Sequence, residues 1–492
     1  MWNSVKRYGN TIRLKLGRLL NLNRGNESIN VVYDNRLEVE KWLNIYRGGS
    51  PWVGDYIGVK GDARVRVTSG DIASSIASTL AKKVSIELGV KEIDGSKETV
   101  EFMEKQAEEI IGKTRRYSEQ VLVQGGGIIK PFFNGERIGL DFFNATSFIP
   151  LRFNDFNELV SVILIDRIED GGKVYTRLEI HDYDEDDRVY TVRNTIHAGQ
   201  GIDFSGRITN EIDPSVIDIW EDYEREVVLV GEDFPASPLF VYVKTPFANI
   251  NDIDSPLGAS VFNKVENLLK DYDEQYSLYI HELKSSRKKT FVPREFYLDK
   301  EDEIGDIIVL MDTDGGVNGE LDKTIKTFSP DIRENDYKNG METILRRIEV
   351  NTGLSYGMLS RVDNVEKTAE EIKNSKQTLW TTVVDIQKSL DISYIKLMHI
   401  IKDLAVDRGL ISNSNKEFII EFDWDDSIIV DKGTMEKNAR EERKEKREEM
   451  KEMREDVASG YISPIFYIMA KYDLTEEEAK KMLNPNNNVT NE

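Results

Sequence analysis

The chain has no cysteine among its 492 residues. This absence excludes disulfides, thiolate metal sites, iron–sulfur clusters and cysteine nucleophiles. A reducing compartment is consistent with such a composition.

Long apolar runs are lacking as well. Runs such as Val227 to Val230 and Ile307 to Met311 have the length of a strand, whereas a helix that spans a bilayer needs roughly 20 apolar residues. The N-terminal segment from Met1 to Arg24 interleaves leucine with lysine and arginine and has no uninterrupted apolar core, so we do not expect secretion. We predict an amphipathic surface helix that packs on its own domain, with a membrane surface or an acidic partner as the alternative.

Positive charge is in deficit. Lysine and arginine number 66 against 89 aspartate and glutamate residues, which gives a formal charge of −23. A protein that coats nucleic acid has the opposite balance, because it neutralises phosphates with basic side chains. With 39% hydrophobic and 32% charged residues, a chain of this length is expected to form several soluble lobes.

Sequence signatures of catalysis are also missing. Four histidines are scattered along the chain and form no zinc-type pair: His181, His197, His281 and His399. No phosphate-binding loop, dinucleotide fingerprint, nucleophile elbow or kinase signature occurs, and Gly125 to Gly127 is predicted to be a turn. The acidic run Asp182 to Asp187 lacks the glycine and the final glutamate of a calcium loop, so we interpret it as a hairpin tip. We expect no catalytic residue, no metal site and no cofactor.

The first half of the chain mixes helix and strand. Apolar residues at helical spacing predict helices over 37–46 and 72–84, the second with Asp71 as its N-cap. From Gln120 onward, short β-rich runs separated by turn residues indicate an antiparallel meander. The expected strands span residues 120–123, 128–133, 159–167, 173–181, 188–195 and 227–230.

A long apolar stripe follows Asp254-Ser255-Pro256, an N-cap with proline at the first helical position. Its spacing of three and four residues predicts one helix of about 40 Å that ends near residue 283. A stripe of this length needs a partner helix or a neighbouring subunit. The stripe comprises Leu257, Val261, Val265, Leu268, Tyr272, Tyr276, Tyr279 and Leu283.

A β insertion and a returning helix come next. We expect strands at 290–292, 296–298 and 307–311, and a helix at 334–350. A glycine-bearing loop then leads to a capping box at Thr368 and to a helix of up to about 60 Å that Gly409 ends. The remaining elements expected are a strand at 417–424, a charged helix at 434–458, two short helices and a disordered tail from residue 485.

Several local sequences, in this order, resemble the portal proteins of tailed bacteriophages. They are Asp254 to Gly258 before the first long helix, Thr352 to Ser355 followed by Lys367 to Ile372, and near the C-terminus Asp425 to Ile428 and Gly460 to Ser463. The last two are similar to patterns in portals of siphophages from Gram-positive hosts.

The resemblance implies an α+β portal fold and a homo-oligomeric ring of about twelve copies at one capsid vertex. Such a ring is not an enzyme. It is the channel for packaging and ejection of viral DNA, and the platform on which terminase and the head-tail adaptor dock. Further implied partners are the major capsid and scaffolding proteins and double-stranded DNA that passes without sequence specificity, and no membrane. The ring would assemble in the host cytoplasm and become part of the virion.

The same resemblance implies a division of the chain into named parts. An α/β wing would span residues 1–255, the stem helices 256–283 and 332–351, the clip 284–331, the tunnel loop 352–367, a long wing helix and strand 368–427, and a helical crown with the tail 428–492.

Three groups of candidate site residues follow from the resemblance. The stem stripe that would face a neighbouring subunit comprises Leu257, Val261, Val265, Leu268, Tyr272 and Tyr276. A basic ring in the clip, or alternatively a solvated helix end, comprises Lys284, Arg287, Lys288 and Lys289. The tunnel loop would face the DNA with Leu354, Ser355, Tyr356, Met358, Arg361 and Lys367.

Two functions from other classes stay open at this point. A metal-dependent nuclease or phosphodiesterase would use a carboxylate cluster such as Asp182 to Asp187 and would cleave DNA with magnesium or manganese. A filament- or scaffold-forming protein would share the long helices but gives no reason for the β insertion. It would form open polymers rather than closed rings.

Overall fold

The computed structural model describes residues 36–58, 64–170, 172–185, 189–198, 211–212, 220, 224–230, 238–286, 289–293, 307–310, 326–328, 331–361, 369–412 and 418–424. The predictions for the N-terminal arm, for a strand at 296–298 and for everything after residue 424 lie outside these residues. The chain divides after Trp424 into two units, so all structure described below belongs to the first.

The N-terminal part combines helices with short strands. Its elements are α2 (Arg36–Tyr46), β1 (Tyr56–Gly58), β2 (Arg64–Arg66), α3 (Ile72–Ser85), β3 (Leu88–Asp94) and α4 (Lys97–Gln124). Both predicted helices are confirmed, as α2 and α3. Asp71 occupies the N-cap position of α3 as predicted, but with a left-handed φ of 55° its side chain makes no capping hydrogen bond.

The predicted strand at 120–123 is in fact the end of α4. Val121, Leu122 and Val123 are all buried, and a helical turn that is apolar on every side has the same local sequence as a buried strand. The helix ends at Gly125, whose φ is 85° and whose N–H donates to the carbonyl of Val121. Gly125 is therefore a helix stop rather than part of a turn between strands.

The larger sheet has the order β10-β9-β8-β7-β6, and β11 also pairs with β9. Its strands are β6 (Phe148–Phe153), β7 (Leu159–Asp170), β8 (Lys173–Asp184), β9 (Val189–Ala198), β10 (Glu211–Ile212) and β11 (Glu226–Val230). Every pairing is antiparallel, which confirms the predicted meander. One of its faces packs around Ile163, Leu178 and Ile180.

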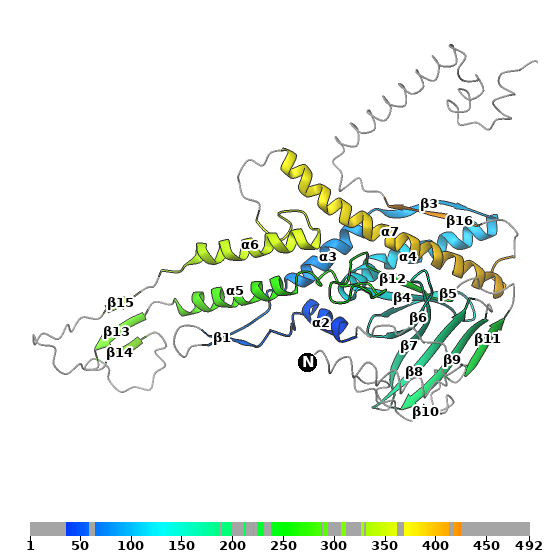
Figure 1. The fold of residues 1–492 in the computed structure, drawn as a ribbon, viewed down its shortest axis with the longest axis horizontal. Coiled ribbons are helices and arrows are strands. Elements are labelled where there is room, and N and C mark those ends of the chain that lie inside the picture. The colour runs from blue at the N-terminus through cyan, green and yellow to red at the C-terminus, as the bar shows by residue number, and fades with distance from the viewer. Residues whose placement is uncertain are drawn as a thin grey trace, which may run out of the picture. The chain divides into compact units, whose positions relative to one another are not determined.

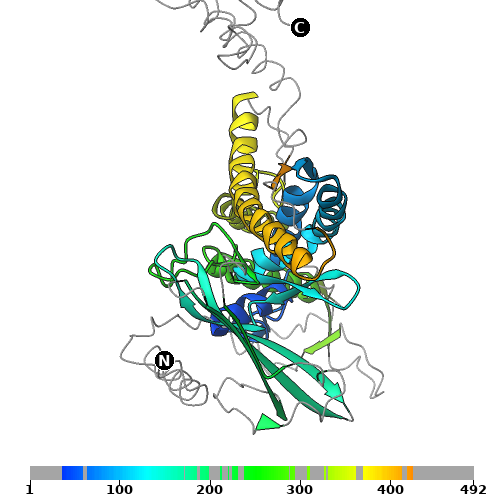
Figure 2. The same cartoon turned by 90° about the vertical axis from the view of Figure 1, so that its right-hand side faces the viewer.

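A smaller sheet links this region to the helices. Its order is β12 (Val241–Lys244), β4 (Gly126–Phe133) and β5 (Ile138–Asn144). The long helix α7 (Ala369–Asp407) contacts β12 and β4, and the long strands of the larger sheet extend away from it (Figure 2). The predicted strand near the end is confirmed as β16 (Ile419–Trp424), which pairs with β3.

Two antiparallel helices carry the β insertion between them (Figure 1). They are α5 (Glu266–Ser285) and α6 (Glu334–Thr352), and Arg333 pairs with Glu282 at 2.6 Å where they meet the insertion. Hydrogen bonds from Arg333 lower the pKa of Glu282 to about 2. The insertion contains β13 (Lys289–Pro293), which pairs in parallel with β14 (Ile307–Leu310) and antiparallel with β15 (Lys326–Phe328).

The first long helix begins later than the sequence predicts. Helix α5 starts at Glu266, and the residues before it form turns. Leu257, Val261 and Val265 are buried in the core of this chain, and the Val261 N–H donates to the Leu122 carbonyl at 2.9 Å. Their spacing therefore belongs to a buried loop and not to a helix stripe. The C-terminal ends predicted for the two later long helices are confirmed. Gly353 follows α6 and Gly409 follows α7, and both glycines have a positive φ.

Gly258 lets this loop cross the end of α4. A Cβ at this position would lie much closer to the carbonyl oxygen of Gly125 than van der Waals contact allows, and 2.8 Å from Thr245 Oγ1. Because backbone atoms cannot rotate away, we expect Gly258→Ala to lower the free energy of unfolding by about 1–3 kcal/mol. Gly340→Ala in α6, where a Cβ meets nothing within 4 Å, should raise it by up to about 1 kcal/mol. Urea denaturation of both variants tests this, and equal stability of Gly258→Ala and the parent chain would contradict it.

Candidate functional site

Helix α5 is fixed to the N-terminal part by polar groups on its buried face. The Asp273 carboxylate, 5% exposed, accepts hydrogen bonds from Trp52 Nε1 and the Gly70 N–H, both at 2.8 Å. Burial raises the pKa of Asp273. Ser277, one turn further along, accepts from the Thr68 N–H at 2.8 Å. These contacts determine which face of α5 is turned inward.

The neighbouring face of α5 keeps apolar surface accessible. Leu268, Tyr272 and Tyr276 are half-buried, and the two tyrosine rings stack with centroids 6.4 Å apart. Leu283, near the end of the helix, is 39% exposed. Six residues were predicted to face a neighbouring subunit. Three of them, Leu268, Tyr272 and Tyr276, lie on α5 and keep accessible surface for such a contact. Those in the preceding buried loop do not, because their own chain already covers them.

The segment after α6 is organised around one buried carboxylate. Glu349 is 1% exposed, and its Oε1 accepts hydrogen bonds from the N–H groups of Gly357 at 3.1 Å, Leu359 at 2.6 Å and Ser360 at 2.9 Å. Its Oε2 accepts from Ser360 Oγ at 2.8 Å. Four donors thus converge on a single side chain, which holds residues 357–360 against the end of the helix. Sequence reasoning missed this residue, because nothing local distinguishes it from the other glutamates.

The predicted tunnel-loop residues differ in their exposure. Leu354 is 2% exposed and belongs to the core, so the prediction that it faces the DNA is wrong. Ser355, Tyr356 and Met358 are half-buried, and Arg361 is exposed. Lys367 lies outside the described residues.

Three contacts give the described part of this loop its form. The Arg361 N–H donates to the Glu342 carboxylate at 2.9 Å, and the Tyr356 hydroxyl donates to the Arg361 carbonyl at 3.2 Å. The Arg346 guanidinium lies over the Tyr356 ring, 5.1 Å from its centroid. The loop is therefore tied to α6 at several points before residue 361.

Within the basic cluster, side-chain exposure is described for Lys284 alone, which is exposed in the last turn of α5. A cation is favoured there by the helix dipole. Arg287 and Lys288 lie outside the described residues, and Lys289 begins β13. A basic ring in this region stays a prediction.

Neither a metal centre nor a membrane span is found in the described part of the chain. No group of three histidine, aspartate or glutamate side chains there could hold a metal ion. At the acidic run, Asp182 pairs with Arg152 at 2.9 Å, and the run ends in the connection between β8 and β9. None of the described helices is both long enough and apolar enough to cross a bilayer.

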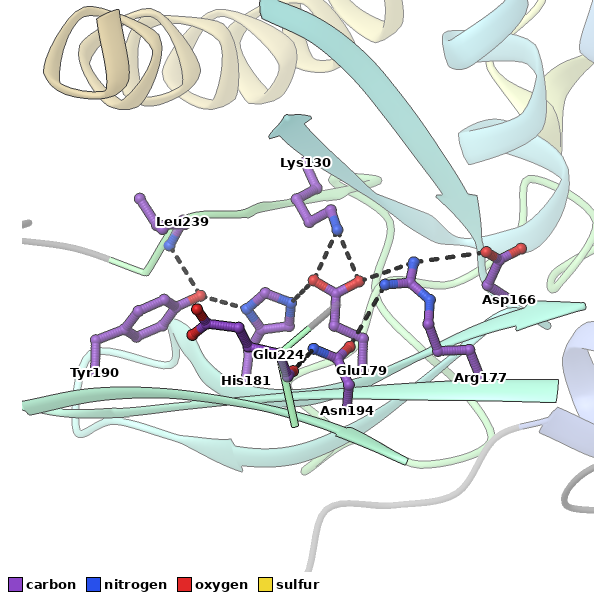
Figure 3. Close-up of polar contacts among 9 residues, drawn as sticks. All are labelled: Lys130, Asp166, Arg177, Glu179, His181, Tyr190, Asn194, Glu224 and Leu239. Atoms are coloured by element: carbon purple, nitrogen blue, oxygen red, sulfur yellow. Dashed lines mark hydrogen bonds and ion pairs between the residues drawn. The ribbon is translucent and has the colours of Figure 1, made fainter. Parts of the chain in front are cut away.

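A buried polar network joins the two sheets (Figure 3). Lys130 of β4 donates to both oxygens of Glu179 on β8 at 2.7 Å, and Arg177 lies 3.3 Å from the same carboxylate. His181 Nε2 lies 2.9 Å from Glu179, and His181 Nδ1 is hydrogen-bonded to the Tyr190 hydroxyl of β9. Arg177, Glu179 and His181 alternate along β8 and so share one face of the strand. That alternation was the available sequence signal, but its partner Lys130 could not be identified locally.

The ionisation of this network follows from its burial and its charges. Although burial raises the pKa of Glu179, the nearby Lys130, His181 and Arg177 hold it well below its usual value. Burial lowers the pKa of His181 and raises that of Tyr190 well above its usual value. A neutral imidazole protonated on Nε2 satisfies every contact, since Tyr190 can donate to Nδ1 while accepting from the Leu239 N–H. This arrangement gives a structural tie between the sheets.

A family model described as phage portal protein, SPP1 Gp6-like, matches residues 83–447. No curated protein matches the chain. Among solved structures, a chain from the "Virion of native gene transfer agent (GTA) particle" is similar at 8% identity with a TM-score of 0.43, and the match covers 86% of this chain and 93% of that chain.

Proposed function

Because this chain belongs to the family of SPP1 Gp6-like phage portal proteins, we propose that α5 and α6 are the stem of the ring through which DNA passes. A portal is a non-enzymatic component of the virion, located at the capsid vertex. Membership of this family excludes the two alternative functions, a nuclease and a filament-forming protein. The observation that supports the stem assignment is the pair of antiparallel helices with a small sheet inserted between them, all within the matched residues.

The other parts are proposed on the same basis. We assign the sheets, the N-terminal helices and α7 to the wing, β13 to β15 to the clip, and residues 352–367 to the tunnel loop. Relative to the sequence-based division, the first stem helix begins at Glu266, and the preceding loop joins the wing core. Residues 428–492 would form the crown.

The wider assembly is proposed too. We expect about twelve subunits, with terminase and the head-tail adaptor docking on the ring and contacts to the major capsid and scaffolding proteins. The patterns at 425–428 and 460–463 support a siphophage of a Gram-positive host.

Charge pairing on α6 suits a helix beside passing DNA. Lys338 pairs with Glu334, and Arg346 pairs with Glu342, each within one helical turn. These carboxylates neutralise cations that would otherwise bind phosphates. In a chain with a formal charge of −23, such pairing lets a duplex slide without sticking.

The stem assignment predicts that Leu268→Asp prevents ring assembly. Leu268 is half-buried in the single chain, so the fold should tolerate the change, but in the ring a charge would be buried between helices. We expect ring formation to weaken by about 100-fold or more. Sedimentation velocity measures the ring fraction, and circular dichroism should show unchanged helix content.

The matched control is Asn267→Asp, which places the same charge one residue away at an exposed position of α5. This variant should assemble like the parent chain. Normal rings from Leu268→Asp would show that the stripe on α5 does not face a neighbouring subunit.

A further inference from the structure

A cavity with basic walls lies where α2, the C-terminal half of α4 and the turn after β5 meet. Its volume is about 580 Å³, and its walls include Arg47, Arg115 and Arg116, all exposed. We call it the arginine pocket. No ion pair to these three side chains is formed within the part of the chain that the structure describes.

The polar groups of the arginine pocket favour an anion. Glu119 is the one carboxylate among the lining residues, and it accepts a hydrogen bond from the Tyr46 hydroxyl at 2.8 Å. The three guanidinium groups therefore outnumber the carboxylate in the walls. Gln124, at 4% exposure, also lines the pocket, and its side-chain oxygen has no hydrogen-bond partner among the described residues. This oxygen is an acceptor, so it suits an N–H group of a bound peptide segment rather than the anion itself.

The chemistry and size of the pocket narrow the class of ligand. Guanidinium groups bind carboxylates through two parallel hydrogen bonds and are more weakly hydrated than ammonium groups. A cavity of this volume admits a few side chains of a peptide segment. A DNA duplex presents its phosphates on a convex rod and cannot enter it.

We propose that the arginine pocket receives a carboxylate-bearing segment of the neighbouring copy of this chain. The inference rests on the ring of the proposed function. Within a ring each subunit uses two different surfaces, one for each neighbour, so a pocket on one copy can meet an acidic segment on the next. Each copy carries a formal charge of −23, and neighbouring copies repel one another unless basic groups lie at their contact.

Charge reversal in the pocket is the test. Arg115→Glu with Arg116→Glu should weaken ring formation by about tenfold or more, and added salt should narrow this difference between the variant and the parent chain, because it screens the charges at the contact. Both residues are exposed, so circular dichroism and the melting temperature should stay unchanged. If the double glutamate variant does not fold, Arg115→Gln with Arg116→Gln removes the same positive charges without adding negative ones.

The matched control reverses two lysines on the exposed surface of the same helix outside the pocket, Lys97→Glu with Lys105→Glu. Sedimentation velocity at several salt concentrations gives the ring fraction, and a mobility-shift measurement with linear duplex DNA runs beside it. A selective loss of rings in the arginine variants supports the proposal. If the arginine variants assemble as well as the lysine control, the proposal is overturned. A loss of DNA binding without a loss of rings also overturns it. If the parent chain formed no ring at all, that result would instead contradict the proposed function.

Discussion

Glu349→Leu is expected to lower the free energy of unfolding by about 3–5 kcal/mol and to release residues 357–360 from α6. The substitution leaves three backbone N–H groups and the Ser360 hydroxyl without their acceptor, and each unsatisfied donor costs roughly 1–3 kcal/mol where water is excluded. Urea denaturation measures the stability. Hydrogen exchange at Gly357, Leu359 and Ser360 should become at least about 100-fold faster, because these amides are protected by the carboxylate.

Two further variants show whether the loss of stability comes from the hydrogen bonds to the Glu349 carboxylate. Glu349→Gln keeps one carbonyl oxygen for the amides and should cost about 1–2 kcal/mol. Glu342→Leu removes an acceptor for the exposed Arg361 N–H and should cost less than about 1 kcal/mol. Unchanged amide exchange in Glu349→Leu would show that the carboxylate does not hold the loop. In the proposed portal the consequence is functional, since a loosened tunnel loop is expected to impair packaging and retention of DNA.

Lys130→Met is expected to destabilise the protein by about 3–4 kcal/mol at pH 7. It removes the cation that contacts both oxygens of the buried Glu179 and leaves that carboxylate with the cation of Arg177, which it shares with Asp166. Removal of one partner from a buried ion pair is costly. Lys396→Met is the matched control, because it breaks a pair with Glu158 in which both side chains are about half exposed. We expect that change to cost less than about 1 kcal/mol. Urea denaturation of both variants compares them directly, and a parent-like Lys130→Met would contradict the role of the network.

The same network predicts how stability depends on pH. The pKa of Glu179 in the folded protein lies below its unfolded value of about 4.5, so its contribution is complete above that pH and is lost as the pH falls through the folded pKa. The pKa of His181 is lowered from 6.5, so acid also favours the unfolded state below that pH. Stability should therefore decline on acidification from about pH 6.5. The difference between the parent chain and Lys130→Met should shrink toward pH 3.

Periodic elements with clear ends could be predicted from sequence. The helices α2, α3, α6 and α7 have regular apolar spacing, and glycines with positive φ follow the last two. The residues from Leu257 to Val265 have the same spacing but lie in a loop. That loop is stabilised by contacts with the end of α4, which is more than 130 residues earlier in the chain, as in the Ser260 to Leu122 hydrogen bond. A local pattern contains no information about such a partner.

In the candidate site, too, local motifs could be predicted from sequence and long-range contacts could not. The order of motifs after residue 250 identified the family. Of the described motifs, Asp254 to Gly258 lies in a loop and Thr352 to Ser355 at the end of α6, where the local sequence is constrained. The exposure of Leu354, the role of Glu349 and the partners of Glu179 all depend on which segments the fold brings together. Burial and long-range pairing are tertiary properties, so these could be learned from the structure alone.

Electron microscopy of the purified chain, paired with its mass in solution, tests the central claim most directly. The account predicts closed rings with a central channel, about a dozen subunits, and the pair α5 and α6 with its β insertion forming a narrow extension along the channel axis. A chain that stays monomeric at every concentration, or that polymerises into open filaments, would contradict it.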